Sequence, residues 1–240
     1  KKGQRKMAKL LYEGKAKQVY ETENPDEYMI HYKDDATAGN GVKHDQFEGK
    51  GVLNNTISCI IFDMLEEAGI KTHMIKKLND RDILVKKVEI FPLEVIIRNI
   101  TTGSFCKRLG APEGVVLDEP IFEMSYKNDD YGDPLINDDH AVALKLATRE
   151  ELAYIKETTL KINELLKEFF LKFNLKLVDF KIEFGKTADG KILLADEISP
   201  DSCRLWDVET NQKYDKDVFR QDIGDLIETY KAVLARMQSK

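Results

Sequence analysis

Residues 177–185 carry charged side chains of alternating sign at every second position. Asp179, Lys181 and Glu183 are separated by apolar residues, and successive side chains of a β-strand point to opposite faces. The three charged groups therefore share one face of a predicted strand, while the apolar residues form a face for the core. An ordinary solvated strand has the same alternation, so this pattern indicates chemistry only when a second group of carboxylates lies beside it.

A second acidic segment comes directly after this strand. The apolar run 193–195 leads into Asp196 and Glu197, and the Asp-Gly pair at 189–190 is typical of a hairpin turn. A hairpin would bring Glu183 near Asp196, and two facing carboxylates repel each other unless a cation lies between them. Oxygen ligands in this number suit Mg²⁺, which leaves its other positions to water and nucleotide phosphates. Because the sequence does not fix the turn type, Glu197 remains an alternative to Asp196 as the metal ligand.

The segment 13–17 has the composition of an anion site. Lys15 and Lys17 are expected on one strand face beside Gly14, where the backbone can approach a phosphate closely. A surface pair of lysines gives the same pattern, and the segment is not a Walker A loop. Taken alone, it therefore favours a solvated basic pair.

The segment 98–104 is a stronger candidate for phosphate binding. Arg98 leaves a predicted strand, and hydroxyl residues and a glycine come after it up to Ser104. Such a segment predicts a cradle for a phosphate monoester. Arg204 either closes on the same group or pairs with Asp201 or Asp207.

The elements that must position these residues form an α+β pattern. Strands are predicted at 10–20 with a hinge at Gly14, and at 28–32, 83–88 and 93–98. Helices are predicted at 54–68, from a capping box of Thr148 and Glu151 to Phe173, and from about Val218 to Leu234, with Asp215 or Asp217 as the last helix's cap. Residues 126–140 are expected to form a long functional loop.

Composition limits the function. The chain has 240 residues, 42% of them apolar and 33% charged, with a net charge of −6, which argues against a general nucleic-acid partner. No apolar run approaches the length of a membrane span and no signal peptide is indicated, so a cytoplasmic protein without a membrane partner is expected. Three widely spaced cysteines predict neither a disulfide framework nor a zinc site. Residues 1–6 are excluded as a basic tail or added segment.

Four segments, in this order, resemble the SAICAR synthetase family: residues 12–17, 92–104, 177–185 and 198–207. The resemblance implies a ligase that uses ATP to join the carboxylate of carboxyaminoimidazole ribonucleotide (CAIR) to the amine of L-aspartate. It also implies a homodimer of two-lobed chains related to kinase and ATP-grasp architecture. The mainly antiparallel β lobe would span residues 7–87, and the α+β lobe residues 88–240.

The resemblance also implies roles for individual residues. ATP would be bound by Lys15, Lys17, Val85 and Lys86, and Mg²⁺ by Glu183 and Asp196. The ribonucleotide would be bound by Arg98, Ser104, Asp201, Arg204 and Lys127. Lys181 and Asp179 fall in the family signature as catalytic residues, the lysine stabilising the substrate carboxylate or the transferring phosphoryl group. Asn40 departs from the family, because some members have an aspartate there.

A kinase and a nucleotide-binding regulatory module are the competing classes. The chain has no His-Arg-Asp or Asp-Phe-Gly catalytic pair. Neither class needs a second phosphate pocket of the kind that Arg98 and Ser104 predict. The ligase that the resemblance implies does have a second phosphate to bind, that of the ribonucleotide. Its chemistry is expected to use ATP to convert the carboxylate to an acyl phosphate, from which the amine displaces phosphate.

Overall fold

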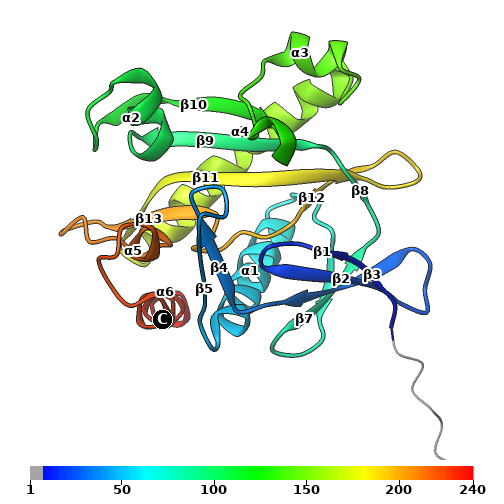
Figure 1. Ribbon diagram of the computed structural model, residues 1–240, viewed down its shortest axis with the longest axis horizontal. Coiled ribbons are helices and arrows are strands. Elements are labelled where there is room, and N and C mark those ends of the chain that lie inside the picture. The colour runs from blue at the N-terminus through cyan, green and yellow to red at the C-terminus, as the bar shows by residue number, and fades with distance from the viewer. Residues whose placement is uncertain (1–7, 240) are drawn as a thin grey trace, which may run out of the picture.

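The computed structural model describes residues 8–239 and consists of two main sheets with helices packed against them (Figure 1). The N-terminal sheet is antiparallel, in the order β1-β2-β3-β7-β6. Its strands are β1 (Leu10–Glu13), β2 (Lys17–Glu21), β3 (Glu27–Tyr32), β6 (Met74–Lys77) and β7 (Asp82–Lys86). β4 (Asp35–Ala38) and β5 (Lys43–Gln46) form a separate ribbon, and α1 (Lys50–Glu67) comes after it.

The second sheet has β11 at its centre, paired with four other strands. Its strands are β8 (Glu89–Ile90), β9 (Leu93–Ile100), β10 (Val116–Tyr126), β11 (Leu175–Lys186), β12 (Ile192–Ala195) and β13 (Cys203–Asp207). The helices here are α2 (Gly103–Leu109), the 3₁₀ turn η1 (Asp129–Tyr131), α3 (Asp138–Ala143), α4 (Arg149–Leu171), α5 (Asp217–Arg220) and α6 (Leu226–Gln238). Every strand pair of both sheets is antiparallel, so the predicted α+β class is confirmed.

The helix α4 begins where the sequence predicts. The Thr148 side chain accepts from the N–H of Glu151, whose carboxylate accepts from the N–H of Thr148. This reciprocal pair satisfies two backbone donors that have no partner within the helix. The apolar stripe of α4 then packs on β11 and β9, the strands that carry the candidate site.

Two helix predictions are wrong in their bounds. α1 begins at Lys50 rather than 54, because Gly49 turns the chain at φ 91° and the first turn packs against β3. A Cβ on Gly51 would lie 2.5 Å from the carbonyl oxygen of Tyr32, so tertiary contact rather than a side-chain cap defines this start. Long-range packing of this kind has no signature in the local sequence.

The predicted last helix is two helices, α5 and α6. The chain breaks between them, where Asp222 adopts φ 54° and Asp225 caps α6 by accepting from the N–H of Glu228. Ile223, which the helical pattern assigned to the apolar stripe, is 56% exposed in this break. Asp215 does not cap the long helix, but accepts from the N–H of Asp217 at the start of α5.

The two sheets share one hydrophobic core. It contains Ile30 and Val85 of the first sheet, Ile97 and Phe180 of the second, and Ile57 of α1 between them. A parallel bridge between Thr72 and Leu194 also links the segment before β6 to β12. No helix within residues 8–239 is long and apolar enough to cross a bilayer.

Candidate active site

The predicted acidic hairpin is present. β11 and β12 pair antiparallel, with Glu183 opposite Ala195, so that Asp196 is the first residue past the end of β12. Asp196 adopts φ 60°, a left-handed conformation that is rare for a residue with a side chain and that recurs at functional sites. Burial and the charge of Asp196 raise the pKa of Glu183 to about 7.

Two lysines neutralise this carboxylate pair. Lys17 of β2 donates to Asp196 and also to Glu197, the latter at 2.7 Å. Lys127, directly after the end of β10, lies 2.5 Å from Glu183. Burial opposes the charged form of Lys17, but the two carboxylates outweigh it and raise the lysine's pKa.

The carboxylate pair fits a magnesium ion. Among residues 8–239 no group of three His, Cys, Asp or Glu side chains is placed to hold a metal ion, so the protein itself would supply two carboxylates, Glu183 and Asp196. Mg²⁺ is usually held by one or two carboxylates, with water and phosphate oxygens completing its shell. Burial, and then the charge of Asp196, raise the pKa of Glu183 despite the lysines, and a divalent cation would favour its ionised form. Glu197 is less available, because Ser199 donates to its second oxygen at 2.6 Å.

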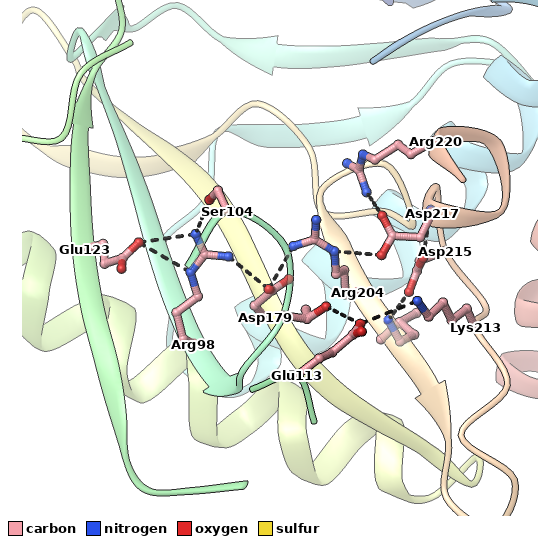
Figure 2. A network of polar contacts seen from close by, with 12 residues as sticks. Arg98, Ser104, Glu113, Glu123, Asp179, Arg204, Lys213, Asp215, Asp217 and Arg220 are labelled. Carbon is pink, nitrogen blue, oxygen red and sulfur yellow. Dashed lines mark hydrogen bonds and ion pairs between the residues drawn. The ribbon is translucent and has the colours of Figure 1, made fainter. Parts of the chain in front are cut away.

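A second cluster forms around Asp179, four residues before Glu183 on β11 (Figure 2). Its Oδ2 accepts from Arg98 Nη1 at 3.1 Å and from Arg204 Nη1 at 2.9 Å. Arg98 Nη2 donates to the hydroxyl of Ser104 at 3.0 Å. The structure thus brings together the three side chains expected to form a phosphate cradle, with a carboxylate between the two guanidinium groups.

The partners suggested for Arg204 from the sequence are wrong. Asp201 instead lies 2.5 Å from Lys50 and accepts from the hydroxyl of Tyr230 at 2.6 Å. Asp207 accepts from Arg236 at 2.9 Å. Burial opposes ionisation of Asp201, but the charge of Lys50 outweighs it and holds the pKa of that carboxyl well below its usual range.

The other predicted site residues lie at the edges of these clusters. Lys181 is exposed on β11 and lies 3.4 Å from Glu94. Val85 is buried in β7, and the N–H of Lys86 donates to the carbonyl of His73. Lys15 is in the bend between β1 and β2, so the expectation that it shares a strand face with Lys17 is wrong.

Sequence reasoning missed a group of cations beside Asp201. Lys50 is buried to 1% exposure at the start of α1, and Lys216 and Arg220 flank the short helix α5. Burial, together with the charges of Arg220, Lys50 and Lys181, lowers the pKa of Lys216 to about 8 against the attraction of Asp201. These residues have no common motif, because only the packing of α1 and α5 against the 199–201 turn brings them together.

Two buried polar atoms in the described chain also lack a hydrogen-bond partner near the acidic hairpin. They are the Tyr32 hydroxyl, whose ring lies 5.7 Å from the Lys17 ammonium, and Nε2 of His73. Burial lowers the pKa of His73 to about 4. Each unpaired buried polar atom costs about 1–3 kcal/mol. Such atoms occur where a bound ligand supplies the missing hydrogen-bond partner.

Comparison with known proteins agrees with this architecture. The family model described as SAICAR synthetase matches residues 10–237. The phosphoribosylaminoimidazole-succinocarboxamide synthase of Finegoldia magna is 68% identical over 228 residues, covering 95% of this chain and 98% of the relative. That of Fusobacterium nucleatum is 60% identical over 232 residues, covering 97% and 98%.

Solved structures give the same result. A SAICAR synthetase in complex with ADP matches with a TM-score of 0.93 and 50% identity, over 95% of this chain and 97% of that one. The synthase from Ehrlichia chaffeensis matches with a TM-score of 0.94 and 45% identity, over 97% and 99%. These matches define an ATP-dependent carboxylate–amine ligase. The chain belongs to the SAICAR synthetase family, the ligases that join CAIR and aspartate in purine biosynthesis.

Proposed function

We propose that Glu183 and Asp196 bind Mg²⁺ with ATP, while Arg98, Ser104 and Arg204 hold the phosphate of CAIR. The observation that carries this proposal is the position of the two clusters on one strand face. Asp179 and Glu183 are separated by four residues of β11, which is roughly 13 Å along a strand. A ribonucleotide whose phosphate lies in the cradle would therefore extend its base carboxylate toward the metal and the nucleotide.

The chemistry requires activation of that carboxylate. One of its oxygens attacks the γ-phosphorus of ATP, the bond to ADP breaks, and an acyl phosphate forms. The aspartate amine then attacks the acyl carbon, the carbon–oxygen bond to phosphate breaks, and the nitrogen loses a proton. Mg²⁺, when bound, would neutralise charge on the phosphate oxygens during the first step.

The residues of this chain supply position and charge. Lys17 and Lys127 pair with the carboxylates in the free protein. Once a metal takes their place, we assign Lys17 to the nucleotide phosphates and Lys127 to the ribonucleotide. Lys181 is assigned to the substrate carboxylate or the transferring phosphoryl group. No covalent nucleophile is needed. Burial raises the pKa of Cys59 to about 11, so its thiol stays protonated.

The cations beside Asp201 suit the amino-acid substrate. L-Aspartate brings two carboxylates, and Lys216 and Arg220 supply positive charge next to the cradle. Burial, with a smaller contribution from the neighbouring cations, lowers the pKa of Lys216, and a bound dicarboxylate would favour its charged form. We therefore assign the aspartate carboxylates to Lys216 and Arg220.

An assay with all substrates tests the reaction. The protein is incubated with ATP, Mg²⁺, CAIR and L-aspartate, and the succinyl adduct is detected by mass together with ADP. We expect the succinyl adduct only in the complete mixture, and no ADP without CAIR. ADP formation that needs CAIR but no aspartate, with transfer of oxygen-18 from the CAIR carboxylate to phosphate after aspartate addition, supports the acyl phosphate. ATP hydrolysis independent of CAIR contradicts the proposal.

The ATP site itself is tested by Lys17→Met, which removes the ammonium and keeps the length of the side chain. Its KM for ATP is expected to rise while the KM for CAIR stays near that of the parent. Lys76→Met is the matched control, because Lys76 is an exposed lysine on β6, an edge strand of the same sheet. From the family we also expect a cytoplasmic homodimer. Sedimentation of the purified chain tests whether it is a dimer.

A further inference from the structure

The cradle is part of a longer chain of alternating charges. Figure 2 shows carboxylates and guanidinium groups joined in sequence across β10, β9, β11, β13 and α5. The order is Glu123, Arg98, Asp179, Arg204, Asp217, Arg220. Two carboxylates therefore hold Arg204, one on each side.

Asp217 is the link between the cradle and α5. Its Oδ2 accepts from Arg204 Nε at 2.9 Å, and its Oδ1 accepts from Arg220 Nη1 at 2.7 Å. Its own N–H donates to Asp215 at 2.8 Å, which fixes the backbone behind the carboxylate. Asp217 is 2% exposed, so these contacts are sheltered from water. Burial opposes its ionisation, but the two arginines outweigh it and lower the pKa of the Asp217 carboxyl.

The geometry leaves one face of Arg204 available. Nε donates to Asp217 and Nη1 to Asp179, so the plane of the guanidinium group is fixed from both ends. Nη2 has no hydrogen bond to any residue of the described chain, and it lies against the bare Cα of Gly103 at the start of α2. A bidentate donor held in this way can bind an anion without first being ordered.

We propose that Asp217 is a positioning residue that aims Arg204 at the ribonucleotide phosphate and ties that arginine to α5. This inference rests on the proposed function, because it takes Arg204 as a phosphate ligand. Asp217 itself would touch no substrate. Without its carboxylate, Arg204 keeps only Asp179, and rotation about the remaining bond would move Nη2 away from the phosphate.

The test uses Asp217→Asn in the full-length chain. We expect the dissociation constant for CAIR, measured by calorimetry, to rise about tenfold, as for a binding group displaced by a fraction of an ångström. The KM for ATP should stay within about twofold of the parent value, because Arg204 and Asp179 separate Asp217 from the residues assigned to ATP and Mg²⁺. Asp207→Asn is the matched control. Asp207 also accepts from an arginine, Arg236, and should leave CAIR affinity unchanged.

A double-mutant cycle separates positioning from a structural role. If Asp217 acts through Arg204, the pair Arg204→Ala and Asp217→Asn should bind CAIR no more weakly than Arg204→Ala alone. Additive losses would overturn the inference, as would unchanged CAIR affinity in Asp217→Asn. Unchanged affinity in Arg204→Ala would instead refute the phosphate site of the proposed function.

Asp217→Glu provides a second variant that keeps the charge. The glutamate keeps a negative charge beside Arg204 and Arg220, so the two arginines are not left unpaired. It moves the carboxylate, however, by the length of one methylene group. A positioning role predicts several-fold weaker CAIR binding at an unchanged melting temperature. Full affinity in this variant would show that only the charge matters, and it would overturn the inference.

Discussion

Gly103 lies so close to Arg204 that a Cβ on the glycine would fall 2.6 Å from Nη2 and 2.8 Å from Nη1. Heavy atoms do not approach to such distances without a hydrogen bond. Gly103 also adopts φ 60°, a conformation that costs an L-residue roughly 1 kcal/mol or more. The absence of a side chain at position 103 is therefore what allows Arg204 to reach the cradle.

Gly103→Ala should displace Arg204 and weaken CAIR binding by about tenfold or more, since a misplaced binding group commonly costs this much. Gly110→Ala is a matched control, because Gly110 has φ 64° but nothing within 4 Å of its would-be Cβ. Both variants should lose stability through the left-handed backbone, Gly103→Ala the more because of the clash, and only Gly103→Ala should raise the KM for CAIR. Equal KM values would contradict a role for the close approach.

Glu183→Gln should abolish the response to Mg²⁺ while stabilising the metal-free protein at high pH. The folded pKa of Glu183 is raised from 4.5 to about 7, so its protonated form is the one that favours folding. That stability is fully present below about pH 4.5 and is lost as pH rises through 7. Melting temperatures in EDTA should therefore be equal for parent and variant at pH 4.5, and higher for the variant at pH 8.

The same titration predicts the pH dependence of magnesium binding. A carboxylate must be ionised to ligate the metal, so the apparent affinity for Mg²⁺ should fall as pH drops through about 7. Calorimetry in two buffers of different ionisation enthalpy would detect the released proton. An affinity that stays constant between pH 6 and pH 8 would remove Glu183 from the metal site.

Ser104→Ala should weaken CAIR binding by about fivefold, the equivalent of one hydrogen bond of roughly 1 kcal/mol. Arg98→Ala should have a larger effect, because it removes the charged donor of the cradle and leaves Asp179 with Arg204 alone and Glu123 with Arg108 alone. Breaking a buried ion pair costs about 3–5 kcal/mol, so the melting temperature should fall too. ATP affinity should hold in both variants, and an equal loss for ATP and CAIR would take these residues out of the phosphate cradle.

Thr148→Ala should lower the free energy of unfolding by about 1 kcal/mol through loss of the α4 cap. Kinetic constants should not change, because the Thr148 side chain accepts from the backbone of Glu151 at the start of α4, which packs against β11 and β9. Urea unfolding measures the first effect and steady-state kinetics the second. A large change in the KM for CAIR would show that the cap also positions the strand.

The local parts of the site could be predicted from the sequence. The charged face of β11 and the hairpin after it result from alternation and a turn signal, which depend on neighbouring residues alone. The contact between Arg98 and Ser104 was also predictable, because the two residues are six positions apart and span the end of a strand; its role in binding phosphate remains a proposal. The sequence also offered Arg204 as a third member of the cradle, but it did not reveal that residue's partners, Asp179 and Asp217.

The parts that failed depend on contacts between distant segments. Lys50 reaches Asp201 across 151 positions of sequence, and neither residue stands in a pattern that points to the other. The break before α6 was missed because Ile223 fits a helical stripe, although it is exposed. The division of the chain after residue 87 remains a prediction.

The bridge between Thr72 and Leu194 has a consequence for cutting the chain at that division. His73 donates to the carbonyl of Leu194, and Leu194 donates to that of Lys71, so β12 is bonded to both parts. If the chain were cut after residue 87, each of the two fragments would expose an unpaired strand edge together with apolar core. We expect neither to be stable alone, whereas co-expressed fragments should reassemble, with the acidic hairpin docked back onto the first half.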